Sequence, residues 1–226
     1  TCRIKQALIK DKRNPNLYLL PSAQTKDKTA VSPDQMKKLA DELKEEHPSA
    51  QVTVIDSLCA SLGQGLLVYK AIMYMQNNHT YKEVIDYVEH IKLNISHRFT
   101  VDSLEHLHRG GRISKSASII GNLINIKPLL YVNDSGALVP TGKIRGRKKS
   151  LLELANLLID AVKNSDMDNS TVAISHGDCP QDAGYLADVI KDNTGISDII
   201  INHISPAIAS HSGPGTVAVF FEAPER

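Results

Sequence analysis

Residues 204–216 form the most concentrated polar stretch of the chain, and a single histidine stands near its middle. Ser210 and His211 are followed by Gly213 and Gly215, which bracket a proline. Glycines let a loop backbone come close to a ligand, and an imidazole with one nitrogen held in place can donate from the other. The pattern therefore favours a loop that binds an anionic head group at His211. The alternative is a tight turn that carries an incidental surface histidine.

A second stretch, residues 143–149, places five cations among seven residues. Arg145, Arg147 and Lys148 lie where an expected strand gives way to an expected helix. Guanidinium and ammonium groups at such a turn suit a phosphate, a carboxylate or an acidic partner. A merely solvated helix start is the alternative, although cations at that end oppose the helix dipole. A nucleic-acid surface is not expected, because aromatic residues make up 4% of the chain and its net charge is +1.

Two further glycine-containing stretches are weaker candidates. In residues 107–113 two glycines stand between Arg109 and Arg112, which favours the end of a helix over an anion cradle. Residues 56–65 are typical of a strand, a turn and a helix start, a potential anion site. They contain neither the dinucleotide-binding nor the P-loop glycine pattern. Cys59 lies in this stretch, and as a nucleophile it lacks an assigned base.

The composition excludes several classes of protein. Of 226 residues, 42% are hydrophobic and 23% charged, as in an ordinary globular protein. Three widely spaced cysteines support neither a disulfide framework nor a zinc site. No apolar stretch approaches the roughly 18 residues of a membrane span, and no signal-peptide pattern opens the chain. We therefore expect a cytoplasmic protein that is not an enzyme and that needs no metal or other cofactor.

Alternating strand and helix patterns must position these stretches. Strands are expected at 17–20, 51–55, 98–101, 126–132, 137–144, 171–175, 199–204 and 216–221. Helices are expected at 4–9, 32–46, 61–76, 81–97, 103–108, 114–124, 147–163 and 181–192. The turn Asn133-Asp134-Ser135-Gly136 predicts an antiparallel hairpin over 126–144. The expected fold class is therefore α/β with a mixed sheet flanked by helices.

A series of motifs, in matching order and spacing, makes residues 47–226 resemble the DegV family of cytoplasmic fatty-acid-binding proteins. That family includes the carrier subunits of bacterial fatty acid kinases. The motifs are Val54-Ile55-Asp56-Ser57, Ala60-Ser61-Leu62-Gly63-Gln64-Gly65, Phe99-Thr100-Val101-Asp102-Ser103-Leu104-Glu105, Arg109-Gly110-Gly111-Arg112-Ile113, Asn125-Ile126-Lys127-Pro128-Leu129, Arg145-Gly146-Arg147-Lys148-Lys149 and Ser210-His211-Ser212-Gly213-Pro214-Gly215-Thr216.

The resemblance implies a two-lobe fold with a truncated, substituted N-terminal α/β lobe over 1–75 and a C-terminal lobe over 76–226. Its implied ligand is a long-chain fatty acid, with the acyl chain in an apolar tunnel and the carboxylate at the lobe interface. A fatty acid kinase catalytic subunit is the implied partner. The implied ligand-binding residues are His211, Ser210, Gly213, Gly215 and Arg145, and those facing the partner or a phosphorylated head group are Arg147 and Lys148.

The front of the chain departs from this family. Residues 5–46 instead resemble a stretch of MinD, the ATPase that places the bacterial division site, without its phosphate loop or catalytic lysines. The DegV hydroxyl motifs that meet the carboxylate are absent, which predicts impaired binding. One alternative is therefore a recombined or engineered chimera of MinD-like and DegV-like pieces with no retained function. Nucleotide binding by the MinD-like piece is the weakest hypothesis, because the phosphate loop is missing.

Overall fold

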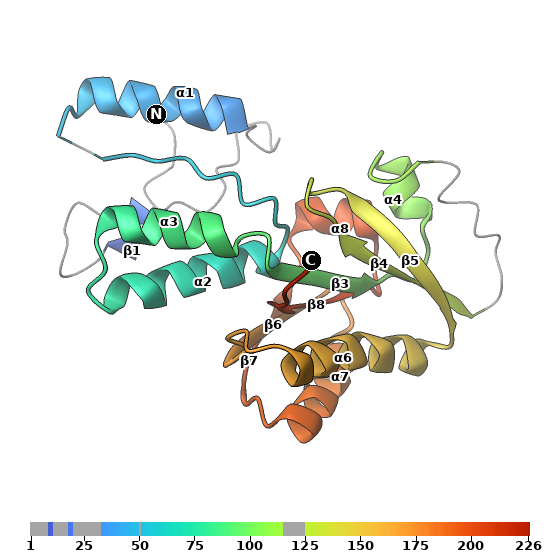
Figure 1. Ribbon diagram of the computed structural model, residues 1–226. Coiled ribbons are helices and arrows are strands. Elements are labelled where there is room, and N and C mark those ends of the chain that lie inside the picture. The colour runs from blue at the N-terminus through green and yellow to red at the C-terminus, as the bar shows by residue number, and fades with distance from the viewer. Residues whose placement is uncertain (1–8, 11–17, 20–32, 50, 115–124) are drawn as a thin grey trace. The chain divides into compact units, whose positions relative to one another are not determined.

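The computed structural model describes residues 9–10, 18–19, 33–49, 51–114 and 125–226 (Figure 1). The chain divides into two compact units. The first comprises Thr1–Ser57 and Val68–His90, and the second comprises Leu58–Leu67 and Ile91–Arg226. The lobe boundary expected after residue 75 stays a prediction. The helices expected at 4–9 and 114–124 lie almost entirely outside the described residues.

The described part of the first unit is mainly helical. It holds α1 (Pro33–Glu46), most of α2 (Leu62–Gln76) and α3 (Tyr81–Ile91). The short strands β1 (Ile9–Lys10) and β2 (Tyr18–Leu19) pair antiparallel. The strand predicted at 51–55 is wrong, since residues 51–60 form neither helix nor strand. An extended segment becomes a strand through a ladder partner, and none pairs with it among the described residues.

α3 begins as its sequence dictates but ends earlier than predicted. Thr80 and Glu83 form a reciprocal capping box: the Thr80 amide donates to Glu83 Oε2 at 2.7 Å, and the Glu83 amide donates to Thr80 Oγ1 at 3.4 Å. The helical period continues through Ile95, yet the helix ends at Ile91 and β3 (Ile95–Thr100) follows. Pairing along the whole of β3 with the last strand of the chain overrides the local helical pattern.

The second unit is built on a six-stranded sheet. Its strands are β3, β4 (Ile126–Val132), β5 (Leu138–Arg145), β6 (Thr171–His176), β7 (Asp198–His203) and β8 (Val217–Glu222). Their order is β5-β4-β3-β8-β6-β7, with β6 and β7 parallel and the other neighbours antiparallel. The predicted α/β fold with a mixed, helix-flanked sheet is therefore confirmed, and so is the hairpin of β4 and β5.

Two helices cover one face of this sheet, α6 (Arg147–Asn164) and α7 (Pro180–Thr194) (Figure 1). Their apolar stripes supply side chains with no exposed surface, among them Leu154 and Leu158 of α6 and Leu186 of α7. Each such side chain contributes about 1.5–3 kcal/mol through burial. This core holds the sheet together, and most of the candidate site residues lie on the helices and loops that connect its strands.

On the opposite face of β3, the buried side chain of His97 contacts Ala60 and Gly63 in the segment 58–67. The Ala60 amide donates to Nε2 of His97 at 3.1 Å, and Nδ1 of His97 donates to the Ile95 carbonyl at 2.8 Å. Burial lowers the pKa of His97 to about 3, and the charge of Arg226 adds to this effect. Gly63 packs so tightly that a Cβ there would lie 2.7 Å from a ring carbon. His97 is therefore a neutral, fully bonded side chain.

Candidate functional site

The histidine of the polar stretch lies near the end of a short helix, α8 (Pro206–Ser212), and not in a loop. Ser205 caps this helix by accepting a hydrogen bond from the Ile208 amide at 3.4 Å. The expectation of a continuous loop over 204–216 is wrong because Ser205 and Pro206 together start a helix, which Gly213 then ends. Both ends of α8 are thus set by local residues.

His211 packs against the short helix α4 (Glu105–Arg109) and the glycines that follow it. Its imidazole lies directly over Gly110, where any Cβ would overlap the ring. Nη2 of Arg112 approaches Nε2 of His211 at 3.3 Å, across 99 residues of sequence. A guanidinium donates and never accepts, so Nε2 is the acceptor and the neutral ring carries its proton on Nδ1. We call His211, Gly110 and Arg112 the α4–α8 corner.

The two glycines after α8 allow close approach of side chains from the β3–α4 region. Gly213 has φ 81°, and a Cβ there would lie 2.7 Å from a ring carbon of His106. Gly215 has φ 73°, and a Cβ there would lie 2.7 Å from Cγ of Asp102. Both glycine amides already donate to backbone carbonyls at 2.8 Å. The loop therefore contributes its shape to the site, and these two amides are not free for a ligand.

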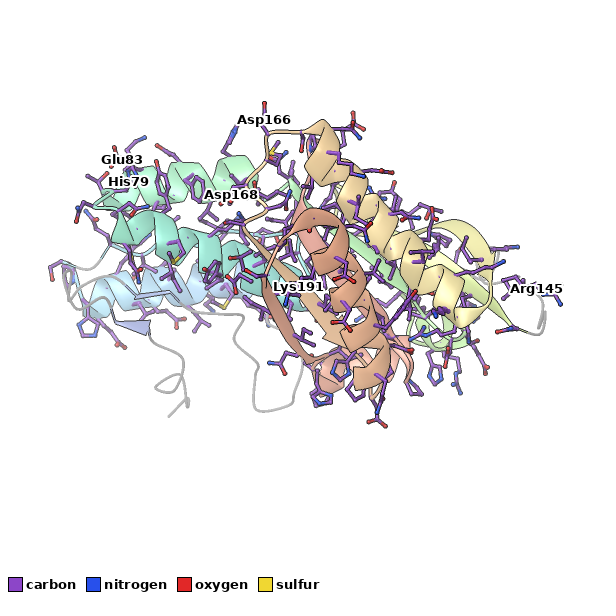
Figure 2. The ribbon with its side chains drawn as sticks, turned by 90° about the horizontal axis from the view of Figure 1, so that it is seen from below. His79, Glu83, Arg145, Asp166, Asp168 and Lys191 are labelled. Atoms are coloured by element: carbon purple, nitrogen blue, oxygen red, sulfur yellow. The ribbon has the colours of Figure 1, made fainter. Side chains whose placement is uncertain are left out.

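Three predicted residues do not contact the corner in the described structure. Ser210 is exposed, and its hydroxyl donates within α8 to the Ala207 carbonyl at 2.8 Å. Arg145 is exposed at the end of β5, from which it projects outward (Figure 2). Nζ of Lys148 lies 5.1 Å from the ring centroid of Tyr185 on α7. Their roles in binding a ligand or a partner stay predictions.

Arg147 turns inward and joins a network of charges beneath the glycine loop. Its Nε donates to Asp182 at 2.8 Å, and its Nη1 lies 4.0 Å from Asp102. Lys127 binds the same Asp102 carboxylate at 2.6 Å, and that carboxylate packs against Gly215. The sequence did not predict the ion pair of Asp102 and Lys127, because their presence in two separate motifs does not show that the two side chains meet. In this arrangement Arg147 supports the loop from below.

A cavity of about 260 Å³ lies behind the same loop, lined by His176, His203 and Pro214 among others. Nδ1 of His176 accepts from the Cys179 amide at 3.3 Å, and burial, aided by His203, lowers the pKa of His176. Burial raises the pKa of the Cys179 thiol, which donates to the Thr216 carbonyl at 3.4 Å. A thiol of raised pKa is a weak nucleophile at neutral pH, so Cys179 serves packing here.

Two searches of the described residues bear on other kinds of site. In these parts of the chain no three histidine, cysteine or acidic side chains are grouped so that they could hold a metal ion. Within the same residues no helix is both long enough and apolar enough to cross a bilayer.

The fold and the corner together define an α/β protein whose paired arginine and histidine suit an anionic group. A family model described as "Uncharacterised protein, DegV family" matches residues 35–224, and the chain belongs to the DegV family. The match begins at residue 35, inside the segment 5–46 for which a resemblance to MinD was expected, so residues 35–46 fall within the DegV match and the comparisons give the expected MinD piece no support.

Curated relatives agree with this assignment. A DegV domain-containing protein of Clostridium perfringens is 46% identical over 181 residues, which is 80% of this chain and 62% of that protein. One from Lactococcus lactis is 36% identical over 176 residues, which is 78% of this chain and 60% of that protein. The chain thus spans about three fifths of the length of these relatives.

Solved structures share the fold. A fatty acid binding DegV family protein from Streptococcus agalactiae is 29% identical, with a TM-score of 0.69 over 85% of this chain and 66% of that one. A DegV lipid binding protein from Thermotoga maritima is 27% identical, with a TM-score of 0.68 over 84% of this chain and 64% of that one. A Eubacterium eligens DegV family protein loaded with heptadecanoic acid, 23% identical, matches with a TM-score of 0.76 over 84% of this chain and 68% of that one.

Proposed function

We propose that this chain binds a long-chain fatty acid, with the carboxylate at the α4–α8 corner, and acts as an acyl carrier without catalysing a reaction. The approach of Arg112 to His211 over Gly110 is the observation that carries this proposal. A guanidinium beside an imidazole supplies the charge-assisted donors that a carboxylate prefers. The relatives from Streptococcus agalactiae and Thermotoga maritima, which bind a fatty acid and a lipid, support the same class of ligand.

An incoming carboxylate replaces Nε2 of His211 as the acceptor for Arg112. The imidazole then carries its proton on Nε2 and donates to the second carboxylate oxygen. The acyl chain supplies most of the binding free energy, since each buried methylene contributes about 0.8 kcal/mol. No cofactor is needed for this role.

A calorimetric titration of the delipidated chain with oleic acid and with oleyl alcohol tests the proposal. We expect the acid to bind at least about tenfold more tightly, because the alcohol cannot accept a charge-assisted pair of hydrogen bonds. Arg112→Gln and His211→Ala should each weaken acid binding, whereas Arg109→Gln, a matched change on α4, should not. Equal affinities for acid and alcohol, or equal effects of the Arg109 and Arg112 variants, would refute the proposal.

The other predicted site residues have supporting roles in this proposal. Gly213 and Gly215 shape the site, Ser210 accepts from bound water at its rim, and Arg145 attracts the acid from solution. Arg147 and Lys148 face the phosphorylated head group or a fatty acid kinase catalytic subunit after a rearrangement that frees them from their present contacts. We also propose a cytoplasmic location and the two-lobe division at residue 75, and pull-down of a fatty acid kinase tests the partner.

The competing hypothesis is a recombined or engineered chain with no retained function. The observation that motivates it is the absence of the DegV hydroxyl motifs from residues 1–46. Its MinD-like piece covers residues 5–46, most of which lie outside the described residues. The same titration separates the two, because this hypothesis predicts no saturable binding of oleic acid.

A further inference from the structure

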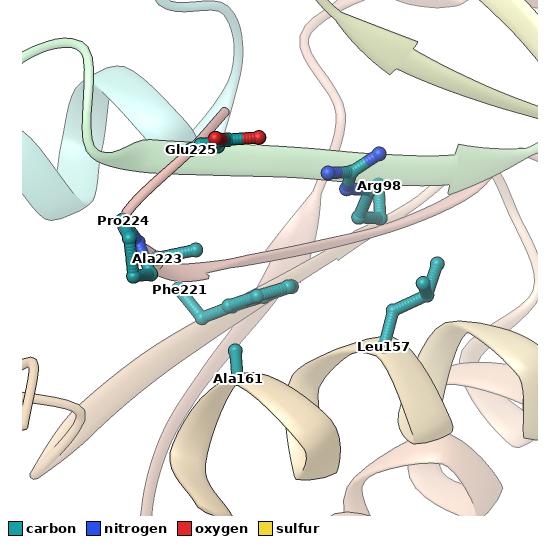
Figure 3. Close-up of a pocket in the computed structure, with 7 residues that line it drawn as sticks. All are labelled: Arg98, Leu157, Ala161, Phe221, Ala223, Pro224 and Glu225. Atoms are coloured by element: carbon teal, nitrogen blue, oxygen red, sulfur yellow. The ribbon is translucent and has the colours of Figure 1, made fainter. Parts of the chain in front are cut away.

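A second cavity, of about 330 Å³, opens between β3, β8 and α6, and no residue of the α4–α8 corner lines it (Figure 3). Much of its wall is apolar: Phe221 lies in β8 and Ala223 directly after it, and Leu157 and Ala161 come from α6. Ligand pockets in proteins range from about 300 to 1,000 Å³. This cavity stands near the lower limit and therefore suits a small molecule better than a long acyl chain.

A half-buried arginine lines the cavity without an acidic partner among the described residues. Nε of Arg98 donates to the Ser96 hydroxyl at 3.1 Å, and its guanidinium lies 5.1 Å from the ring centroid of Tyr131. Both neighbours are uncharged, so they do not neutralise the guanidinium. Burial lowers the pKa of Arg98, which is the sign of a cation that has lost water without gaining an anion. The Arg98 guanidinium is thus available to a carboxylate.

The cavity also has a carboxylate at its rim. Glu225 is exposed and lines the same cavity, and its carboxylate points toward the side on which the Arg98 guanidinium lies (Figure 3). No ion pair joins Glu225 and Arg98 within the described residues. A simple anion would be attracted by Arg98 and repelled by Glu225, and a simple cation the reverse. A ligand that carries both charges complements this rim.

We propose that this cavity binds a small zwitterion with an apolar side chain, namely an apolar α-amino acid such as leucine. The α-carboxylate binds Arg98, the α-ammonium binds Glu225, and the side chain packs on Phe221, Leu157 and Ala161. This site is separate from the fatty acid site and does not rest on the proposed function.

A nuclear magnetic resonance titration of the full chain with L-leucine tests the ligand class. We expect saturable shifts at strands β3 and β8 with a Kd of about 1 mM or below. Three analogues each lack one feature: 4-methylpentanoate lacks the ammonium, 3-methylbutylamine lacks the carboxylate, and glycine lacks the side chain. Each should bind at least about tenfold more weakly. No saturable shift with leucine up to about 10 mM, or equal binding of the analogues, overturns the proposal.

Substitutions locate the site. Arg98→Gln keeps a donor for Ser96 and should weaken leucine binding about tenfold or more, as should Glu225→Gln. Lys163→Gln removes one charge from the last turn of α6 outside the cavity lining and should leave the Kd unchanged. Ala161→Phe fills the cavity and should abolish binding, which keeps the test decisive if the Arg98 variant fails to fold. Unchanged binding in the Glu225 and Ala161 variants would place leucine elsewhere and refute the site.

Discussion

Protonation of one buried imidazole should make the second unit sensitive to acid. His97 is 1% exposed, and its two nitrogens are used by the Ala60 amide and the Ile95 carbonyl. A protonated ring would present N–H to the Ala60 amide, so one hydrogen bond would become a repulsive contact between two donors. Folding and protonation of His97 are therefore linked.

The size and sign of this linkage follow from the two pKa values. Burial holds the folded-state pKa of His97 at about 3, against 6.5 for the exposed side chain. Between these pH values the unfolded chain binds a proton that the folded chain does not, so stability falls as pH falls. The loss is about 1.4 kcal/mol per pH unit, which gives about 2 kcal/mol by pH 5 and about 4 kcal/mol by pH 3, where the folded-state ring is itself half protonated. Above pH 6.5 the contribution is complete.

Urea unfolding followed by far-ultraviolet circular dichroism between pH 7.5 and 4.5 measures the effect. His97→Gln should be less stable at pH 7 yet lose stability less steeply toward acid, so its disadvantage shrinks by about 2 kcal/mol at pH 5. His90→Gln, at an exposed position on α3, should keep the slope of the parent chain. The ¹⁵N shifts of the His97 ring report its protonation directly. A titration midpoint near 6.5 in the folded protein, or equal slopes in the parent chain and His97→Gln, would refute the reasoning.

Three further predictions concern packing and reactivity. Gly110→Ala places a Cβ against the imidazole of His211, so it should lower the free energy of unfolding by about 1–3 kcal/mol and weaken fatty acid binding. Gly184→Ala places a Cβ in open space on α7, so it should raise the free energy of unfolding by about 0.5–1 kcal/mol. Urea unfolding measures both changes in stability. Leu158→Ala removes a side chain that has no exposed surface, so it should lower the free energy of unfolding by about 2–5 kcal/mol. Leu152→Ala, at a side chain that is 41% exposed, should lower it much less. The Cys179 thiol, whose pKa burial raises, should react with iodoacetamide at pH 7.5 more slowly than a free cysteine. Peptide mass mapping measures the rate of alkylation of Cys179. A rate equal to that of free cysteine would contradict the raised pKa of this thiol.

Much of the second unit could be predicted from short-range patterns. The turn residues 133–136 predicted the hairpin of β4 and β5 correctly. In that turn the Asn133 side chain accepts a hydrogen bond from the Ala137 amide at 2.9 Å, and Gly136 has a φ of 77°. The apolar stripe of α6 gave the helix that covers the sheet. These features depend on residues close in sequence, which a pattern of spacing and propensity captures.

The errors arose where distant residues decide. Ile95 continues the helical period of α3, yet it pairs with Glu222 in the sheet. The residues next to Ile95 in sequence do not indicate this distant partner. His211 could be selected by its glycine-rich context, but its contact with Arg112 spans 99 residues. The inward turn of Arg147 depends likewise on Asp182 and Asp102, which lie in other elements. Chemistry-bearing residues can thus be listed from sequence, while their pairing requires the fold.

The strand order has a consequence for biosynthesis. β8 lies between β3 and β6, so in the described sheet it alone joins the β5-β4-β3 half to the β6-β7 half. β8 also follows the other five strands of this sheet in the chain, so it leaves the ribosome after them. The two halves of the sheet therefore cannot join, and the β3 and β6 edges that pair with β8 stay unpaired, until residues 217–222 have been synthesised. A nascent or truncated chain without these residues should expose two adhesive strand edges and be a substrate for chaperones or proteases.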